Sequence, residues 1–334
     1  METIGLIYEI TGNPYFGINE NEEYSNKISE YVYPSEINDI CVAIENLGFE
    51  YKIIDGPKGL LNDVLSGQKC DLYFNKSIGF KGLERKIAVP AISQLYKLPI
   101  IGSNAYAMTL ARHKYHTNRL LSGMGLKVPY SIIVKDVNLI PKIKLFPVIV
   151  KPNEESDSLG ISENSICYNV NEVIENVILL FNNFKQPVII EQFISGEEWK
   201  IAVIGNNENT HSYGGVNSLK NGITMKGTLQ TRNDILDNLL TYSPISKCKL
   251  FTKALRKAEQ VHNLLGLNDY SRCDFRIGED NELYCMEVST HPFLVNSIKD
   301  SSFIYAAMQQ LLDYNSIIKK IIEASKIRNN MQYS

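Results

Sequence analysis

The pattern of hydrophobic and polar positions in the first hundred residues predicts alternating strands and helices. Short continuous hydrophobic runs at residues 4–8, 51–54 and 70–74 are typical of buried strands in a parallel sheet. Between the first two runs, hydrophobic residues from 34 to 47 recur with helical spacing and stop at Gly48, which favours a helix end. Strand, helix and strand in this order predict βαβ units.

The pattern beyond residue 83 predicts the remaining elements. Helical spacing recurs at residues 83–96, 103–121, 171–184, 247–265 and 315–327. Strands are expected at residues 99–102, 127–134, 147–151, 165–168, 188–193, 200–204, 210–215, 270–277 and 283–288. A polar loop is expected at residues 11–26, and an irregular stretch at residues 217–241.

These elements divide the chain into three parts. Residues 1–106 show the alternation of an α/β domain with a parallel sheet. Residues 107–193 and 194–334 each combine strands with a few helices, which is typical of α+β lobes. We therefore expect a mixed α/β and α+β fold of three parts.

Composition and charge narrow the possible functions. The 334 residues include 34 Lys and Arg against 37 Asp and Glu, so the net charge of −3 excludes a strongly basic nucleic-acid binder. No run of about 18 hydrophobic residues predicts a membrane span, and the first residues lack the pattern of a signal peptide. The six cysteines are scattered singly, which favours free thiols over zinc ligands or disulfides. These features predict a cytoplasmic protein with no nucleic-acid or membrane partner.

Two neighbouring segments could bind phosphate groups. Lys151 ends a buried strand, where its ammonium could hold a phosphate, although an ordinary solvated lysine also fits. Residues 153–160 are rich in small and hydroxyl side chains and end in Gly160, so their backbone N–H groups could approach an anion closely. The segment is not a P-loop, and a surface hairpin uses the same residue types.

A third segment, residues 188–198, could bind a nucleoside. A hydrophobic strand leads into residues 191–194, whose backbone groups could face the edge of a purine, and Glu198 could accept hydrogen bonds from ribose hydroxyls. Taken alone, a strand and turn with solvated acids explains this pattern as well.

The fourth segment is a pair of strands that carries acids on one face. Alternation places Arg272 and Asp274 on one face of the first strand, and Glu287 and Ser289 on one face of the second. Two facing carboxylates repel each other unless a cation lies between them, and oxygen ligands suit Mg²⁺. Surface pairing of each acid with a lysine is the weaker explanation, because hydrophobic residues flank both acids.

In this order, the four segments resemble the ATP-grasp superfamily, in particular its D-alanine–D-alanine ligase branch. The resemblance extends from about residue 72 to 296 and is most specific at residues 146–160, 191–198 and 270–292. It implies an N-terminal pre-ATP-grasp domain (1–106), a central ATP-grasp lobe (107–193) and a C-terminal ATP-grasp lobe (194–334). It also implies ATP and Mg²⁺ as cofactors, and a homodimer.

The resemblance implies a role for each matching residue. Arg272 and Lys226 would act in catalysis, and Asp274, Glu287 and Ser289 would bind the metal. The remaining positions would bind the nucleotide: Lys114, Lys151, Ser156, Ser158, Leu159, Gly160, Glu191, Phe193, Ile194, Glu198 and Met286.

Several positions depart from the family pattern, mostly those that would contact substrate. Ser289 replaces the asparagine of the metal motif, and Phe293 replaces a glycine. Ile78 replaces a histidine, and Asp157 replaces a serine in the phosphate-covering loop. The segment that engages the first D-alanine is absent, and the loop at residues 11–26 stands in its place. Asp157 and Lys76 add charge on the substrate side, which hints at a polar or cationic substrate.

We therefore expect an ADP-forming carboxylate–amine ligase of small amino-acid-like molecules other than two D-alanines, with a role in secondary metabolism. A nucleotide-binding protein that has lost catalysis is the alternative from another class, and Ser289 favours it. A true D-alanine–D-alanine ligase is a further alternative, and a kinase-like or carboxylase ATP-grasp enzyme fits the motifs less well.

Overall fold

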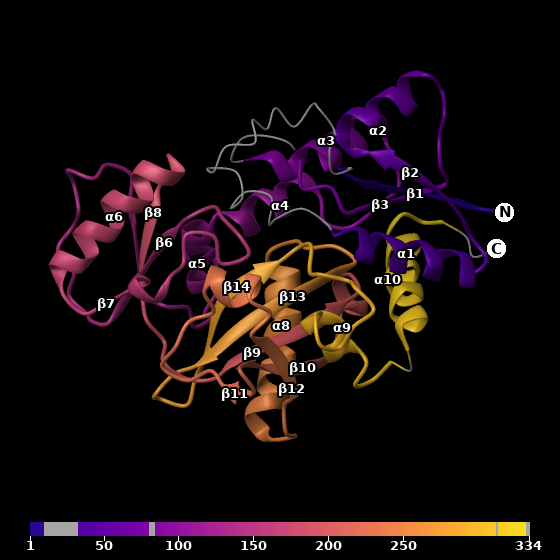
Figure 1. Ribbon diagram of the computed structural model, residues 1–334. Coiled ribbons are helices and arrows are strands. Elements are labelled where there is room, and N and C mark those ends of the chain that lie inside the picture. The colour runs from indigo at the N-terminus through magenta and orange to yellow at the C-terminus, as the bar shows by residue number, and fades with distance from the viewer. Residues whose placement is uncertain (10–32, 80–83, 312, 332–334) are drawn as a thin grey trace.

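Three β-sheets with their helices make up the described part of the chain, which comprises residues 1–9, 33–79, 84–311 and 313–331 of a computed structural model (Figure 1). The strands of the three sheets lie within residues 3–101, 131–192 and 198–289, and the predicted mixed fold is confirmed. The loop expected at residues 11–26 lies outside the described residues.

The N-terminal sheet is parallel, as the sequence predicts. Its strands lie in the order β2-β1-β3-β4, with bounds β1 (Thr3–Tyr8), β2 (Glu50–Asp55), β3 (Leu72–Asn75) and β4 (Ile100–Ile101). The accompanying helices are α1 (Pro34–Asn46), α2 (Gly56–Leu65), α3 (Ala88–Tyr96) and a 3₁₀ turn, η3 (Arg85–Ile87). The hydrophobic centre of β1 is fully buried, which explains why this strand reads as a continuous hydrophobic run.

The central sheet is antiparallel, in the order β5-β8-β6-β7. Its elements are β5 (Ser131–Val134), β6 (Val148–Pro152), η4 (Glu163–Ser165), β7 (Ile166–Cys167), α6 (Val170–Phe184) and β8 (Val188–Gln192). Helix α6 begins at Asn169, whose side chain accepts a hydrogen bond from the Glu172 N–H, and buries Val173 and Val177 toward the sheet. Helices α4 (Ala105–Arg112) and α5 (Lys114–Gly123) precede this sheet.

The C-terminal sheet is the largest, with the path β11-β10-β9-β13-β14 and β12 paired to β10. Its strands are β9 (Glu198–Ile204), β10 (His211–Lys220), β11 (Ile223–Thr224), β12 (Leu240–Pro244), β13 (Tyr270–Ile277) and β14 (Leu283–Ser289). The turn η5 (Asn207–Asn209) follows β9, and the helices are α7 (Arg232–Leu236), α8 (Lys249–Leu264), α9 (Ser302–Ala307) and α10 (Tyr314–Arg328). Alternating residues of β9 pack into two different cores, Ile201 with α8 and Ala202 with α9, so both faces of the sheet are covered.

Helix α10 returns from the C-terminal part to the N-terminal sheet. It packs against α1 and β4, and Figure 1 shows the two helices side by side. One hydrophobic core joins Leu6 and Phe74 of the first sheet with Tyr270, Phe303 and Ile317. The first and last parts of the chain therefore share a core.

The structure differs from the predicted elements in four places. The helix expected at residues 103–121 is two helices, because His113 leaves the helical conformation between α4 and α5. Helices α2 and α9 were not predicted, and the irregular stretch at 217–241 contains the end of β10, β11, α7 and the start of β12.

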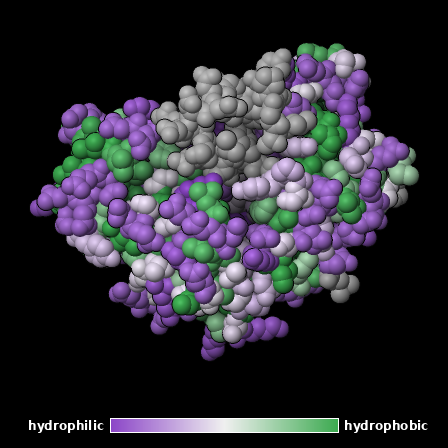
Figure 2. Space-filling view, viewed as in Figure 1, coloured by the Kyte–Doolittle hydropathy of each residue, from purple (hydrophilic) through white to green (hydrophobic). Residues whose placement is uncertain are grey.

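Hydrophilic and hydrophobic residues are interspersed on the face of the molecule shown in Figure 2. Figure 2 shows hydrophilic residues over much of the visible face, with hydrophobic residues in small groups between them. Among the described residues, no helix is long and hydrophobic enough to cross a membrane.

Candidate active site

A cavity of about 510 Å³ is lined by residues from all three parts of the chain. Lys76 and Ile78 follow β3, Lys151 lies near the end of β6, and β13 and β14 contribute Arg272 and Glu287. This volume lies in the range typical of small-ligand sites. Four sequence segments that are far apart in the chain therefore meet at one place.

The paired strands β13 and β14 form one wall of the cavity. Asp274 lies directly opposite Glu287, and Arg272 lies opposite Ser289, so the predicted strand pair and the shared face are confirmed. All four residues line the cavity. The register shift after Asp274 leaves both Met286 and Glu287 along the cavity wall.

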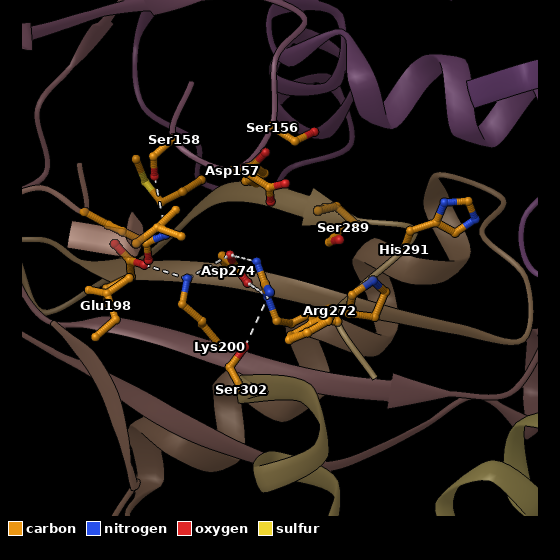
Figure 3. Close-up of a pocket in the computed structure, with 18 of the residues that line it drawn as sticks. Ser156, Asp157, Ser158, Glu198, Lys200, Arg272, Asp274, Ser289, His291 and Ser302 are labelled. Carbon is orange, nitrogen blue, oxygen red and sulfur yellow. Dashed lines mark hydrogen bonds and ion pairs between the residues drawn. The ribbon is translucent and has the colours of Figure 1, made fainter. Parts of the chain in front are cut away.

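Asp274 is held between two cations. Arg272 Nε and Nη2 donate hydrogen bonds of 2.7 and 2.8 Å to the two carboxylate oxygens, and Lys200 Nζ lies 3.2 Å from Oδ2 (Figure 3). Burial alone would lower the pKa of Lys200 and of Arg272, but the neighbouring carboxylates raise the pKa of each above its ordinary value. Both side chains are therefore charged at neutral pH, and the bidentate contact fixes the orientation of Arg272.

Glu198 lies at the other side of Lys200. Its carboxylate forms ion pairs with Lys200, at 2.7 Å from Nζ to Oε1, and with Arg276, at 3.0 Å from Nη2 to Oε2. Burial would raise the pKa of Glu198, but these two cations hold it well below the ordinary range. Glu198 is therefore ionised, and its position on the cavity wall leaves it accessible to a ligand.

Lys151 is oriented by a buried partner. Its Nζ lies 2.8 Å from Glu191 Oε1, and Asn118 Nδ2 donates to the other carboxylate oxygen at 2.9 Å. Glu191 is completely buried and does not line the cavity. We propose that Glu191 positions Lys151, in place of the nucleotide contact that the resemblance implies.

The loop from Asn153 to Gly160 reaches over the cavity from the end of β6. Ser156, Asp157 and Ser158 line the cavity, and Asp157 and Ser158 have φ angles of 53° and 57°, in the left-handed region. Lys114 donates a hydrogen bond to the Glu155 carbonyl oxygen and lies 3.5 Å from Glu287 Oε1. Lys114 thus links this loop to the wall formed by β14.

Two residues of the loop face away from the cavity. Leu159 is 2% exposed, and a side chain at Gly160 would meet Pro152 at 2.6 Å. Neither lines the cavity, so Gly160 permits close packing of the loop onto β6.

The comparisons with known proteins agree with this geometry. Residues 120–323, more than half of the chain, match the family model described as "D-ala D-ala ligase C-terminus". The chain belongs to the D-alanine–D-alanine ligase family. Members of this family are ATP-grasp carbon–nitrogen ligases that use ATP and Mg²⁺.

Individual relatives are distant but cover most of the chain. A D-alanine–D-alanine ligase of Geobacter sulfurreducens is 26% identical over 76% of this chain and 77% of its own length. An uncharacterized protein of Sinorhizobium fredii is 24% identical over 86% of this chain and 87% of its own length. The crystal structure of a Bacillus anthracis D-alanine–D-alanine ligase complexed with ATP superposes with a TM-score of 0.72 at 18% identity, covering 99% of each chain. This last similarity shows the fold.

The positions that carry the family resemblance fall into two groups. Those that line the cavity are Lys114, Lys151, Ser156, Ser158, Phe193, Ile194, Glu198, Arg272, Asp274, Met286, Glu287 and Ser289. Lys226 lies outside the cavity, where its side chain is 66% exposed and approaches Glu197 at 3.4 Å. Glu191, Leu159 and Gly160 also lie outside it.

Several charged residues of the cavity were not singled out from the sequence, among them Lys200, Arg276 and Arg232. Lys200 and Arg276 hold Glu198, and Lys200 could have been found, because it stands two positions after Glu198 on the same face of β9. Arg232 lies in the stretch that the pattern left irregular, and no local signal marks it.

Proposed function

We propose that this chain is an ADP-forming ligase that joins a carboxylate and an amine of two small, amino-acid-like molecules. The observation that carries the proposal is the joint placement of Lys114, Lys151, Arg272, Asp274 and Glu287 around one cavity. Such a constellation concentrates positive charge and paired carboxylates where a nucleotide's phosphates can lie.

The paired carboxylates suit Mg²⁺. Asp274 and Glu287 face each other across β13 and β14, and Ser289 lies one alternation further along the same wall. Among the described residues, no cluster of three or more acidic, His or Cys side chains could enclose a metal by itself. Mg²⁺ needs no such enclosure, because it is commonly held by one or two carboxylates together with substrate phosphates and water. When bound, Mg²⁺ would neutralise phosphate charge.

In the proposed reaction, an oxygen of the acid attacks the γ-phosphate, which forms an acylphosphate and releases ADP. The amine then attacks the acyl carbon to give a tetrahedral intermediate. The C–O bond to phosphate breaks as this intermediate collapses, and the phosphate leaves with the proton that the amine nitrogen loses. Arg272 is oriented by Asp274 so that its remaining N–H groups can stabilise the charge that develops on the transferred phosphoryl group or on the tetrahedral oxygen. Enclosure by the loop at residues 153–160 limits the access of water to the acylphosphate.

We propose that the substrates differ from two D-alanines. Three positions that depart from the family pattern, Ile78, Asp157 and Phe293, line the cavity, which supports a changed substrate site. Asp157 makes no ion pair or hydrogen bond with the other described residues, and its carboxylate can receive a cationic group. Lys76 does not supply free charge as the sequence hinted, because it forms a buried ion pair with Glu36 at 2.7 Å.

Phosphate release over a matrix of amino acids and amines, with ATP and Mg²⁺, tests this proposal. We expect release only when an acid and an amine are both present, and at most weak release with D-alanine alone. Strong turnover with D-alanine as the only amino acid would contradict the changed substrate and leave the ligase activity intact.

The alternative is a nucleotide-binding protein without catalysis, favoured by Ser289 in the metal motif. ATP would then raise the melting temperature, as any ligand of the folded state does, and no member of the matrix would release phosphate. Retention of the oriented Arg272 supports the enzyme, because a binding protein has no need of it.

We also infer from the resemblance that the protein is a cytoplasmic homodimer with a role in secondary metabolism. Sedimentation velocity tests the dimer directly. A single species with the mass of one chain would contradict it.

A further inference from the structure

Arg232 is a buried cation that forms no ion pair with the described residues around the cavity of the proposed ligase. Its side chain is only 9% exposed and lines the cavity. The guanidinium atoms Nε and Nη1 are buried and have no hydrogen-bond partner among the described residues. An unpaired buried charge is costly, so an arrangement of this kind indicates a site for an anion that arrives from outside.

The backbone of Arg232 is fixed against the loop that covers the cavity. Its N–H donates to the Ile161 carbonyl oxygen at 3.2 Å, and the neighbouring Gln230 donates from Nε2 to Ser158 Oγ at 3.3 Å. Thr231 and Asp234 cap the start of α7 reciprocally, and Asp234 pairs with Lys220 at 2.9 Å. Arg232 is therefore held at the junction of the central and C-terminal lobes.

Asp157 lies close enough to interact with both Arg232 and the Arg272 of the proposed reaction centre. Asp157 is an exposed residue of the cavity wall, and its carboxylate interacts electrostatically with Arg232, Arg272 and Glu287. Figure 3 shows Asp157 on the side of the cavity that faces the Arg272–Asp274 pair. Arg232 therefore lies in the same part of the cavity as Arg272 and Glu287. Lys226, six residues earlier in the sequence, is exposed on the surface.

We propose that Arg232 binds the terminal phosphoryl group of ATP in this chain, and that Lys226, to which the resemblance gave a catalytic role, does not contact the nucleotide. The inference rests on the proposed function, because it requires ATP in this cavity. A guanidinium matches phosphate oxygens in a planar, two-point contact that an ammonium cannot make. ADP lacks the terminal group, so this contact discriminates between the two nucleotides.

Calorimetric titration with ATP and with ADP, each with Mg²⁺ and without other substrates, tests the assignment. We expect Arg232→Gln to weaken ATP binding about 10- to 100-fold, as for a lost charge-assisted hydrogen bond, and ADP binding less than about 3-fold. Arg232→Lys should recover part of the loss. Arg256→Gln, on the exposed face of α8, is the matched control and should change neither affinity.

A second readout separates binding from a structural role. Removal of an unpaired buried charge should leave the melting temperature of the nucleotide-free protein unchanged or higher, whereas loss of a structural contact would lower it. The proposal is overturned if Arg232→Gln weakens ATP and ADP equally, or if Lys226→Ala alone removes the preference for ATP. A wild-type protein that binds neither nucleotide would contradict the proposed function itself.

Discussion

At the scale of single residues, the charge of the cavity wall depends on a few oriented pairs. Burial would raise the pKa of Glu287, but Lys114 and Lys151 hold it below its ordinary value, so Glu287 is ionised. We predict that Glu287→Gln lowers turnover at least about 100-fold, or about 2.7 kcal/mol of barrier, because it removes one of two proposed metal carboxylates. Steady-state phosphate release measures this.

The control for that variant lies on the same hairpin. Glu282→Gln removes an acid near the start of β14 that pairs with Lys253 and lies outside the cavity. Its turnover should stay within about 2-fold of wild type, which is the scatter expected where no transition-state contact is lost. Equal turnover rates for Glu287→Gln and wild type would contradict the proposed role of Glu287 as a metal ligand.

Lys86, which lines the cavity, is expected to make the free energy of unfolding depend on pH. Desolvation, reinforced by the positive charge of Arg112, lowers the pKa of Lys86 from 10.5 to about 7. Below pH 7 the folded and unfolded chains both hold the proton, so the cost of burying the charge is fully present. Between about pH 7 and 10 the folded chain has lost the proton and the unfolded chain keeps it, so stability rises with pH.

We therefore predict that Lys86→Met is more stable than wild type at pH 6, and that this advantage shrinks as the pH rises toward 10. Urea unfolding of both proteins across this range measures the difference. An advantage that is constant with pH would show that Lys86 does not titrate in this window.

At the scale of elements, a buried ion pair connects α1 to the segment after β3, and the same carboxylate accepts a hydrogen bond from the segment after β14. Glu36 and Lys76 are 1% and 2% exposed, and Glu36 Oε1 also accepts the Leu294 N–H at 2.6 Å. We predict that Glu36→Gln lowers the free energy of unfolding by about 3–5 kcal/mol, because Lys76 stays buried without its partner. Urea unfolding measures this, and Glu36→Gln with Lys76→Met should recover most of the loss. A double variant no more stable than the single one would contradict the pairing.

The elements also show how far the sequence could predict the molecule. Continuous hydrophobic runs located β1 and β6, and alternation located β13 and β14 with their acids on a shared face, because burial on one or both faces imposes these patterns. Helix α2 was missed although Pro57 stands in its first turn, a recognisable start signal.

The site was predictable where its residues are local to a strand. Glu191 was predicted to bind the nucleotide because it stands near the end of a strand in a segment typical of nucleotide binding. Its pairing with Lys151 could not be predicted, because that depends on the register between β6 and β8. Lys226 was singled out and Arg232 was not. Both lie in a stretch without periodicity, where only tertiary packing decides which side chain faces the cavity.

At the scale of the whole molecule, Asp269 joins three segments that are distant in sequence. Its carboxylate is completely buried and accepts two hydrogen bonds from Arg328 of α10, at 2.9 and 2.8 Å. It also accepts hydrogen bonds from the Gly102 N–H at 2.8 Å and from Asn206 Nδ2 at 3.0 Å. We predict that Asp269→Asn lowers the free energy of unfolding by about 3–5 kcal/mol. Asparagine tolerates the φ of 66° at this position, so the loss reports the charge and the lost hydrogen-bond acceptor rather than backbone strain.

The same variant should bind ATP with unchanged affinity, because Asp269 lies outside the cavity. Chemical denaturation followed by circular dichroism, together with calorimetric titration, measures both quantities. A large loss of ATP affinity without loss of stability would mean that Asp269 acts on the site and not on the shared core.

The central claim is that the cavity activates a carboxylate by phosphorylation before an amine attacks it. The most direct measurement supplies the acid labelled with ¹⁸O in its carboxylate, together with the amine, ATP and Mg²⁺, and analyses the products by mass spectrometry. The account predicts ADP, an amide, and one ¹⁸O atom transferred from the acid to inorganic phosphate. Release of AMP carrying the label, or phosphate without it, would contradict the account.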